Sequence, residues 1–346
     1  MTGQHLLLEI RDLRTYYYLH EGTVKAVDGV SFCVPRHSTV GVVGESGCGK
    51  TVMARSVLQI LDRGGRIIAG SMVFHRQRPG TGNSESAIED EIDLARLHPR
   101  GKQMRAIRGA EIAMIFQEPM SAFSPVHTIG RQLTEAITLH RKVTRPEARE
   151  LAIATLRDVN IPRPEQCFDA HPHQLSGGMR QRAMIAMALC CRPSLLIADE
   201  PTTAIDVTTQ AQVLDLLRRL QEEYGMSIML ITHDLGVIAE MADHVVVMYL
   251  GRVVEQGPVD EIFHDPKHPY TRSLLQSIPK LGPKLRGKLQ TIAGSIPSPY
   301  DRPPGCTFHP RCPSFMPGVC DNQEPRAVDL DSRRSVSCLL YRGGSA

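Results

Sequence analysis

Gly44-Glu45-Ser46-Gly47-Cys48-Gly49-Lys50-Thr51 decides the fold, because this stretch matches the phosphate-binding pattern G-x4-G-K-[ST]. An apolar strand is predicted from Ser38 to Val43, directly before it, and a helix from Lys50 to Leu61, directly after it. The glycines let successive backbone N–H groups converge on an anion, and the start of the helix adds its positive end. We expect Lys50 to contact the β- and γ-phosphates of a nucleotide and the Thr51 hydroxyl to bind Mg²⁺. The strand–loop–helix setting disfavours the alternative of a chance glycine-rich loop.

The composition of the chain agrees with a soluble protein built around this loop. Its 346 residues are enough for one large domain and a smaller appendage. The 40 basic and 37 acidic residues give a formal charge of +3, which is too small to favour a nucleic-acid surface. No apolar run approaches the roughly 20 residues that cross a bilayer, and the first residues, MTGQHLLLEIRDL, do not resemble a signal peptide. We therefore expect a cytoplasmic protein that reaches a membrane only through a partner.

Apolar strands and helices alternate in the second half of the chain, which predicts a mostly parallel sheet covered on both faces. The predicted strands are Leu195–Ala198, Ile228–Ile231 and Val245–Met248. Between the first two, an amphipathic helix is expected from Val207 to Tyr224, with Gly225 as its stop.

The flanking regions have different patterns. Residues 5–35 predict short strands, LLLEIRDL, TYYYL and GVSFCV, with a turn at His20-Glu21-Gly22. Residues 76–92 are polar and turn-rich and predict a surface insertion, whereas residues 130–190 predict helices. Many prolines fall within residues 279–325, so we place the boundary of a second, smaller unit near residues 265–285.

Two acidic residues follow the first of these strands, in Leu195-Leu196-Ile197-Ala198-Asp199-Glu200. Two acids after a strand can also be the N-cap of a helix. Together with the phosphate loop upstream, however, this pattern is typical of the Walker B strand of nucleotide hydrolases. We expect Asp199 to bind Mg²⁺ and Glu200 to polarise the attacking water.

The run Leu175-Ser176-Gly177-Gly178-Met179-Arg180-Gln181-Arg182 resembles the signature motif of ABC ATPases. Ser176 and the two glycines open a helix whose free N–H groups can face a phosphate. In that family, the phosphate belongs to ATP held by the P-loop of the opposite subunit. Met179 departs from the usual glutamine, and the Met-Arg-Gln-Arg variant is typical of peptide importers.

Other ABC motifs are recognised by the same resemblance. Tyr17 is the candidate to stack on adenine, with Tyr16 and Tyr18 as alternatives, and ordinary strand aromatics remain possible for all three. The resemblance identifies Gln117 as the Q-loop glutamine, Ala204-Ile205-Asp206 as the D-loop and His233 as the switch histidine. It implies that Gln117 senses Mg²⁺ and the γ-phosphate, that His233 contacts the γ-phosphate, and that two such ATPases close around two ATP molecules.

The fold class implied is an α/β P-loop NTPase of the ABC ATPase type. Such a protein has a mostly parallel sheet core, an antiparallel β N-terminal subdomain and a helical subdomain. We expect an ATPase domain over residues 1–265, with its helical subdomain at about 118–190. A small C-terminal extension over residues 266–346 follows.

A single set of motifs without membrane spans favours a separate subunit of a transporter. His268–Leu275, Gly294–Pro299 and the run from Pro304 to Cys312 resemble the ATP-binding subunits of oligopeptide, dipeptide and nickel importers. That resemblance implies a second homologous ATPase, two membrane permeases and, indirectly, an extracytoplasmic binding protein. Peptides are the expected cargo, with nickel and oligosaccharides as alternatives. A non-transport ABC protein with a redox-sensing tail is the alternative from another class.

Four of the nine cysteines lie in the tail: Cys306, Cys312, Cys320 and Cys338. Four thiolates suit either a [4Fe–4S] cluster or tetrahedral zinc. The wide spacing C-x5-C-x7-C-x17-C lacks the tight pairs of structural zinc sites and favours the cluster. Zinc, or thiols that only pack, are the alternatives. Arg311 and His309 are expected either beside such a site or as surface charges.

Overall fold

The computed structural model describes residues 6–78, 88–117, 123–203, 206–277, 292 and 294–341. These residues divide into two compact units. The first comprises Met1–Val34, Val40–Arg96 and Thr232–Ala346, and the second comprises Pro35–Thr39 and Leu97–Ile231. No helix in the described ranges combines the length and the apolar character that a membrane crossing needs.

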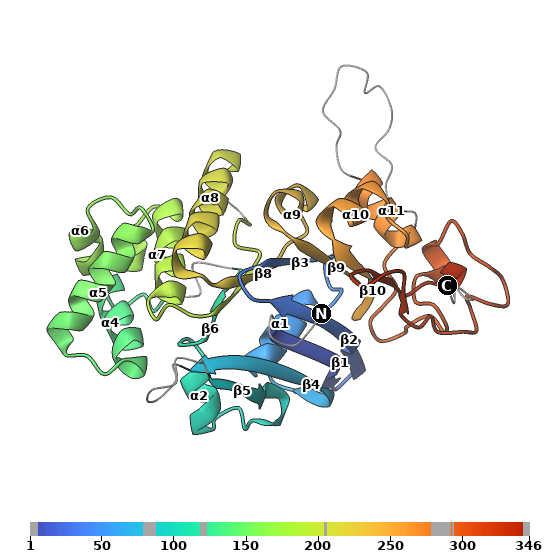
Figure 1. Cartoon of the computed structure of the whole chain (residues 1–346), viewed down its shortest axis with the longest axis horizontal. Helices are drawn as coiled ribbons and strands as arrows, with labels where there is room; N and C mark the ends of the chain where they lie inside the picture. The colour runs from blue at the N-terminus through green and yellow to red at the C-terminus, as the bar shows by residue number, and fades with distance from the viewer. Residues whose placement is uncertain are drawn as a thin grey trace, which may run out of the picture. The chain divides into compact units, whose positions relative to one another are not determined.

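A four-stranded sheet of order β2-β1-β4-β5 lies in the first unit (Figure 1). The pairs β1–β4 and β4–β5 are antiparallel, as predicted for the N-terminal region. The strands are β1 (Leu6–Leu19), β2 (Gly22–Pro35), β4 (Gly65–Arg78) and β5 (Ile88–Asp93). The prediction of two separate strands over residues 6–19 is wrong. An irregularity between Arg11 and Thr15, with Asp12 at a φ of 44°, shifts the register while β1 continues past it.

The first unit also contains strands in the order β11-β12-β10-β9-β3. The strand β3 (Thr39–Val43), which leads into the phosphate loop, pairs in parallel with β9 (His244–Tyr249). The other neighbours, β9 with β10 (Arg252–Pro258), β10 with β12 (Ser335–Val336) and β12 with β11 (Val328–Asp329), are antiparallel. The helical elements of this unit are α1 (Lys50–Val57), η2 (Leu94–Arg96), α9 (Leu235–Met241), α10 (Val259–His264), α11 (Pro269–Gln276), η4 (His309–Arg311) and η5 (Leu339–Tyr341).

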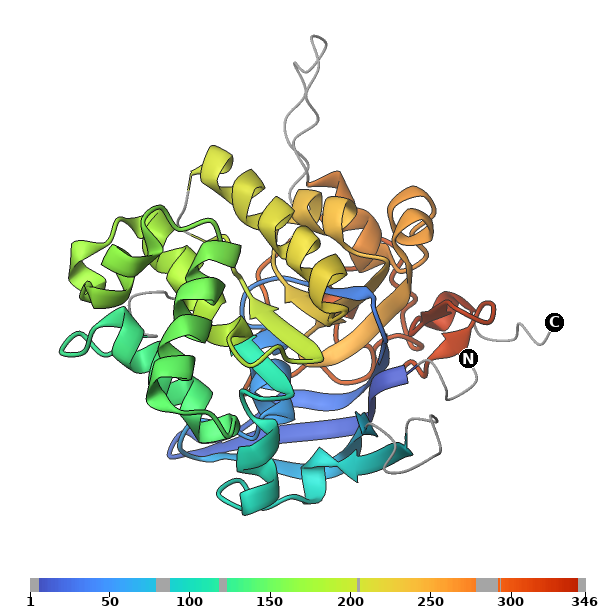
Figure 2. The same cartoon turned by 60° about the vertical axis from the view of Figure 1, so that its left-hand side comes forward.

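Three parallel strands in the order β8-β7-β6 form the sheet portion of the second unit. They are β6 (Ile112–Ile115), β7 (Leu195–Asp199) and β8 (Ser227–Ile231), and every residue in them is buried. The helical elements of this unit are α2 (Lys102–Ile107), α4 (Ile129–His140), α5 (Arg145–Asp158), α6 (Pro164–Asp169), η3 (Pro172–Gln174), α7 (Gly177–Leu189) and α8 (Val207–Tyr224). Figures 1 and 2 show α4, α5 and α6 gathered at one end of the unit, and α7 packs against both this group and β6.

Element boundaries confirm most of the sequence predictions. Helix α8 ends at Tyr224, and Gly225 adopts the left-handed conformation with a φ of 64° that stops it. Helix α1 is shorter than predicted, because Gln59 turns out of the helical region with a φ of 50°.

The predicted insertion at residues 76–92 is in part a strand pair. Gln77 of β4 lies opposite Glu89 of β5, while residues 79–87 lie outside the described ranges.

The C-terminal tail belongs to the first unit. Glu255 of β10 lies opposite Val336 of β12, so the tail extends the sheet order of that unit. Residues 294–341 otherwise form turns and short 3-10 segments, drawn in red beside β10 in Figure 1. The boundary between an ATPase domain and an extension near residue 265 stays a prediction.

Candidate nucleotide site

Three glycines of the predicted phosphate loop have a positive φ. Gly44 and Gly49 have φ values of 151° and 99°, and a Cβ at either would collide with a carbonyl oxygen, of Met248 and of Ala26 respectively. Gly47 has a φ of 78° and has open space where a side chain would begin. A side chain is therefore excluded at two positions by packing and disfavoured at the third by backbone strain.

Lys50 lies folded beneath this loop. Its buried ammonium group donates to the carbonyl oxygens of Gly44 at 2.6 Å and of Glu45 at 3.1 Å. Helix α1, which begins at Lys50, has neither a side-chain cap nor an acidic residue in its first turn. The positive end of this helix and the lysine charge are thus directed to the same small region, which is the arrangement that binds phosphate.

The second unit brings together the predicted catalytic carboxylate and the predicted Q-loop glutamine. Gln117 Nε2 donates to Glu200 Oε2 at 2.8 Å, although the two residues are 83 positions apart. Thr203 Oγ1 donates to the same oxygen at 2.9 Å, a contact that sequence reasoning missed. Asp199, at the end of β7, is 1% exposed, and Glu200 leaves the strand with a φ of 49°. The two successive carboxylates therefore have different surroundings. Asp199 is buried, and Glu200 accepts hydrogen bonds from Gln117 and Thr203.

The predicted signature residues begin helix α7. Ser176 is its N-cap, with the hydroxyl accepting from the Met179 N–H at 3.3 Å. Gly177 is exposed, has no positive φ, and has nothing within 4 Å of the position where a Cβ would lie. A Cβ at Gly178 would make only an ordinary contact with Thr209, at 3.6 Å. The fold itself therefore does not require glycine at these two positions.

His233 lies just beyond β8. The N–H of the preceding residue, Thr232, donates to the carbonyl of Val42 at 3.3 Å, so His233 follows a residue held against the carboxyl end of β3. The His233 side chain is exposed.

The three candidate tyrosines at the end of β1 differ in their surroundings. Tyr16 donates its hydroxyl to Asp28 at 2.7 Å and is buried. Tyr17 is half-buried with its ring against Gly65, while the Tyr18 ring is 50% exposed beneath Arg66. The hydroxyl of Tyr16 is thus already engaged, and Tyr17 remains the candidate for adenine stacking.

The predicted site residues are distributed over both units. Tyr17, the loop Gly44–Thr51 and His233 belong to the first unit, and Gln117, Ser176–Gly178, Asp199 and Glu200 to the second. Of the predicted D-loop, Ala204 and Ile205 lie outside the described residues. Asp206 caps α8, accepting from the Thr209 N–H at 2.9 Å.

The four tail cysteines do not form a metal site as they stand. Across the described ranges, no group of three or more His, Cys, Asp or Glu side chains is arranged to hold a metal ion. Burial raises the pKa of Cys306 to about 11 and also raises the pKa of Cys312 and Cys338. The expected cluster therefore has no support in this geometry. The alternative expectation that Arg311 is a surface charge is wrong, because its side chain is only 4% exposed.

Comparison with known proteins agrees with this geometry. The family described as "ABC transporter" matches residues 27–203, and the "Oligopeptide/dipeptide transporter, C-terminal region" matches residues 254–320. The chain is 47% identical over 336 residues to the oligopeptide transport ATP-binding protein AppD of Bacillus subtilis, covering 97% of each. It is 43% identical over 332 residues to the dipeptide transport ATP-binding protein DppD of Escherichia coli, covering 96% of each. Among solved structures, the dimeric bacterial ABC transporter cassette MJ0796 is similar, with 25% identity and a TM-score of 0.60 over 73% of this chain and 99% of that one.

Proposed function

The chain belongs to the ABC transporter ATP-binding family, in the group that carries the oligopeptide/dipeptide transporter C-terminal region, and from this premise we propose that it hydrolyses ATP to drive a peptide importer. The observation that carries the proposal is the contact between Gln117 and Glu200 at the end of β7. It places a held carboxylate next to the buried Asp199, as a nucleotide hydrolase needs for water activation and Mg²⁺ binding.

Each side chain has a role in the proposed reaction. Lys50 and the loop N–H groups would hold the β- and γ-phosphates, and Thr51, Gln117 and Asp199 would hold Mg²⁺. Mg²⁺, when bound, neutralises charge that develops on the phosphate oxygens. Glu200 orients and polarises the attacking water, with its carboxylate held in place by Gln117 and Thr203. His233 contacts the γ-phosphate.

The exposed start of α7 supports a role for a second ATPase subunit. Ser176, Gly177 and Gly178 present N–H groups at a helix N-terminus without an acidic residue in the first turn. Since the fold does not require these glycines, we attribute them to the close approach of ATP bound by another subunit. We propose that this partner is a related ATPase, so that the pair closes as a heterodimer.

The same family membership implies membrane permeases as the partners that this ATPase drives. We propose that the subunit works at the cytoplasmic face of the membrane, beneath two permeases supplied by an extracytoplasmic binding protein. Di- or oligopeptides are the proposed cargo, because the relatives AppD and DppD are named for oligopeptide and dipeptide transport. Nickel or an oligosaccharide is the alternative within the same architecture.

The Glu200→Gln variant tests the proposed chemistry. Loss of the carboxylate should lower ATP turnover by about 100-fold or more while ATP binding is retained, because the amide cannot polarise water. Phosphate release measures ATP turnover, and titration with ATP measures ATP binding. Size-exclusion chromatography in the presence of ATP should show that the closed dimer accumulates. The Thr203→Val variant, which leaves the carboxylate in place, serves as the control and should lose less activity. Turnover of Glu200→Gln like that of the unaltered chain would remove Glu200 from this role.

A [4Fe–4S] cluster on Cys306, Cys312, Cys320 and Cys338 remains a proposal that rests on their spacing alone. Iron, acid-labile sulfide and zinc content of the anaerobically purified protein tests it. About four irons and four sulfides per chain, lost in Cys320→Ser, would support the cluster. One zinc, or no metal, would exclude it and leave a structural staple or packing thiols.

A further inference from the structure

The C-terminal tail contacts the phosphate loop at Glu45. The Glu45 carboxylate accepts two hydrogen bonds from the guanidinium group of Arg311, at 2.7 and 3.0 Å. The Arg311 side chain is 4% exposed and that of Glu45 is 20% exposed, so this ion pair is largely screened from water. Arg311 follows Glu45 by 266 positions and ends the 3-10 segment η4. The tail therefore reaches into the loop that was predicted to bind phosphate.

The backbone of the same residue is held as well. The Glu45 N–H donates to the hydroxyl of Tyr270 at 2.9 Å, and Tyr270 lies in α11 and is completely buried. The Glu45 carbonyl in turn accepts from the Lys50 ammonium at 3.1 Å. The residue that the tail fixes is thus itself a partner of the lysine that is expected to bind the phosphates.

Arg311 and Tyr270 are themselves fixed by an aromatic cluster formed by Tyr249, Tyr270 and Phe308. The ring centroids of Tyr249 and Tyr270 are 4.7 Å apart. The Phe308 centroid lies 5.2 Å from that of Tyr249 and 5.4 Å from that of Tyr270. The Arg311 guanidinium lies 5.9 Å from the centre of the Tyr249 ring and donates to its hydroxyl at 3.4 Å. Close packing of this kind leaves the two contacts to Glu45 little freedom to adjust.

The Glu45–Arg311 pair also has an electrostatic consequence. Glu45 places a carboxylate within the loop to which the anionic triphosphate must come. An unpaired carboxylate there would repel the phosphates in a region where burial limits screening. The guanidinium of Arg311 neutralises this charge with two hydrogen bonds in the planar geometry that arginine favours.

We propose that the tail is a positioning element of the nucleotide site, in which Arg311 neutralises and orients Glu45 while Tyr270 fixes its backbone. ATP affinity then depends on the contacts of Arg311 and Tyr270 with Glu45. This inference rests on the proposed ATPase function. The inference goes beyond that function because it makes Arg311 a positioning residue, which acts on the phosphates only through Glu45.

The test compares ATP binding and hydrolysis of full-length variants. Arg311→Met should raise the Kd and KM for ATP about tenfold or more, because it leaves the Glu45 carboxylate unpaired beside the phosphates. The kcat should stay within about twofold, since the groups that activate water are unchanged. In Glu45→Gln/Arg311→Met, removal of the unpaired charge should restore most of the ATP affinity. Tyr270→Phe, which keeps the ring, should weaken ATP binding by a smaller factor.

Arg302→Met is the matched control. Arg302 is a half-buried tail arginine that also forms an ion pair, with Asp28 at 2.8 Å, but its carboxylate partner lies in β2 and not in the phosphate loop. This variant should leave the KM for ATP within about twofold, even where its thermal stability falls as much as that of Arg311→Met.

An unchanged ATP affinity in Arg311→Met would overturn the inference. Equal losses in Arg311→Met and Arg302→Met, or no recovery in the double variant, would do the same, because they indicate a general loss of folding. An unaltered chain that neither binds nor hydrolyses ATP would instead refute the proposed function.

Discussion

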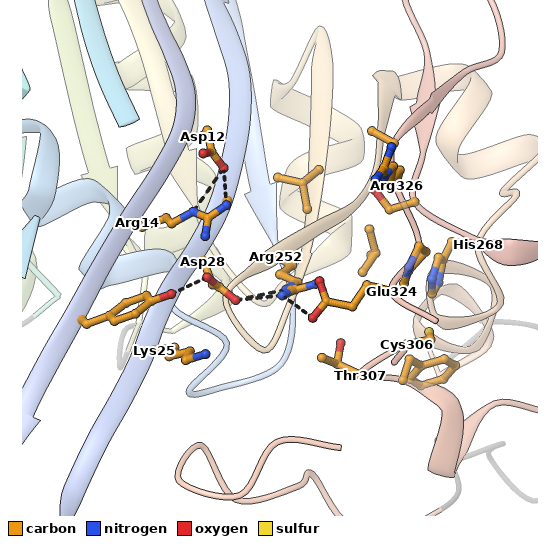
Figure 3. A pocket seen from close by; sticks show the side chains of 18 residues that line it. Asp12, Arg14, Lys25, Asp28, Arg252, His268, Cys306, Thr307, Glu324 and Arg326 are labelled. Carbon is orange, nitrogen blue, oxygen red and sulfur yellow. Dashed lines mark hydrogen bonds and ion pairs between the residues drawn. The ribbon is translucent and has the colours of Figure 1, made fainter. Parts of the chain in front are cut away.

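At Asp28, three segments of the first unit meet on one carboxylate. Tyr16 donates to it at 2.7 Å, Arg252 of β10 at 2.9 Å and Arg302 of the tail at 2.8 Å. Figure 3 shows Arg252 between Asp28 and Glu324, at a pocket whose lining does not include the phosphate loop. Burial by itself raises the pKa of Asp28, but the hydrogen bonds from Tyr16 and Arg252 and the charges of the two arginines outweigh it and lower the pKa to about 2. The carboxylate is therefore a second anchor for the tail.

This anchor predicts a dependence of stability on pH. The folded pKa of about 2 lies below the ordinary value, so the ionised form of Asp28 stabilises the fold above about pH 4. That contribution, about 2 kcal/mol, should be lost as the pH falls through the folded pKa. The free energy of unfolding, measured from pH 5 down to 2, should fall less steeply in Asp28→Asn than in the unaltered chain. Asp12→Asn, which removes an exposed ion pair with Arg14, is the control, and an equal effect of both substitutions would contradict the role of Asp28.

Individual residues of the site could be predicted only where a local pattern marks them. The loop Gly44–Thr51, Asp199 and Ser176 each belong to a short run with a physical meaning. In the structure, three loop glycines have a positive φ and Ser176 is the N-cap of α7. The contacts of Thr203 with Glu200 and of Arg311 with Glu45 were missed. The second pair joins residues 266 positions apart, and no local pattern marks either as a partner of the other.

At the scale of elements, the start of α7 separates a requirement of the fold from a requirement of function. Gly177→Ala should leave the free energy of unfolding unchanged or raise it by up to about 1 kcal/mol, because alanine favours the helix and its Cβ meets open space. ATP turnover should nevertheless fall about tenfold or more. The added methyl group would obstruct the approach of ATP bound by the second ATPase subunit, and a cost of about 1.4 kcal/mol in the activation free energy lowers the rate about tenfold.

Gly130→Ala in α4 is the matched control for this prediction. There a Cβ would collide with the ring of Phe168, so stability should fall. Unfolding measurements and phosphate-release assays on both variants give the comparison. Full turnover in Gly177→Ala would mean that nothing approaches this helix start closely.

The elements were predicted well where the hydrophobic periodicity and the residues that end an element agree. Helix α8 ends at Tyr224, directly before Gly225, and the mainly apolar strands β7 and β8 are buried throughout. Predictions were wrong where a backbone irregularity has no strong residue signal. The positive φ of Asp12 accompanies a register shift in β1 without ending the strand, and Gln59 follows the end of α1 before Leu61, although neither residue is a glycine or proline. Polar residues around 76–92 indicated a loop, yet Arg78 at the end of β4 pairs with Ile88 at the start of β5.

At the scale of the whole molecule, each unit carries part of what a nucleotide hydrolase needs. The first unit holds the phosphate loop and the tail that contacts it, and the second holds the carboxylates and the signature helix. Fold class and family could be predicted from the sequence, because the six motifs from the phosphate loop at Gly44 to the switch histidine His233 follow one another in the order of ABC ATPases. A small C-terminal extension over residues 266–346 with a four-cysteine metal site stays a prediction. What the sequence did not indicate are the ion pairs that join this tail to Asp28, Glu45 and Glu255 of the first unit.

Peptide uptake tests the central claim most directly, since it joins the chemistry of Glu200 to transport. Cells whose only copy of this subunit is Glu200→Gln should take up labelled di- and oligopeptides at the background rate, with the variant present at the membrane in normal amount. Cells with the unaltered chain should accumulate the peptides in an ATP-dependent manner. Equal uptake of every labelled peptide by the two strains would contradict the claim that this ATPase drives a peptide importer.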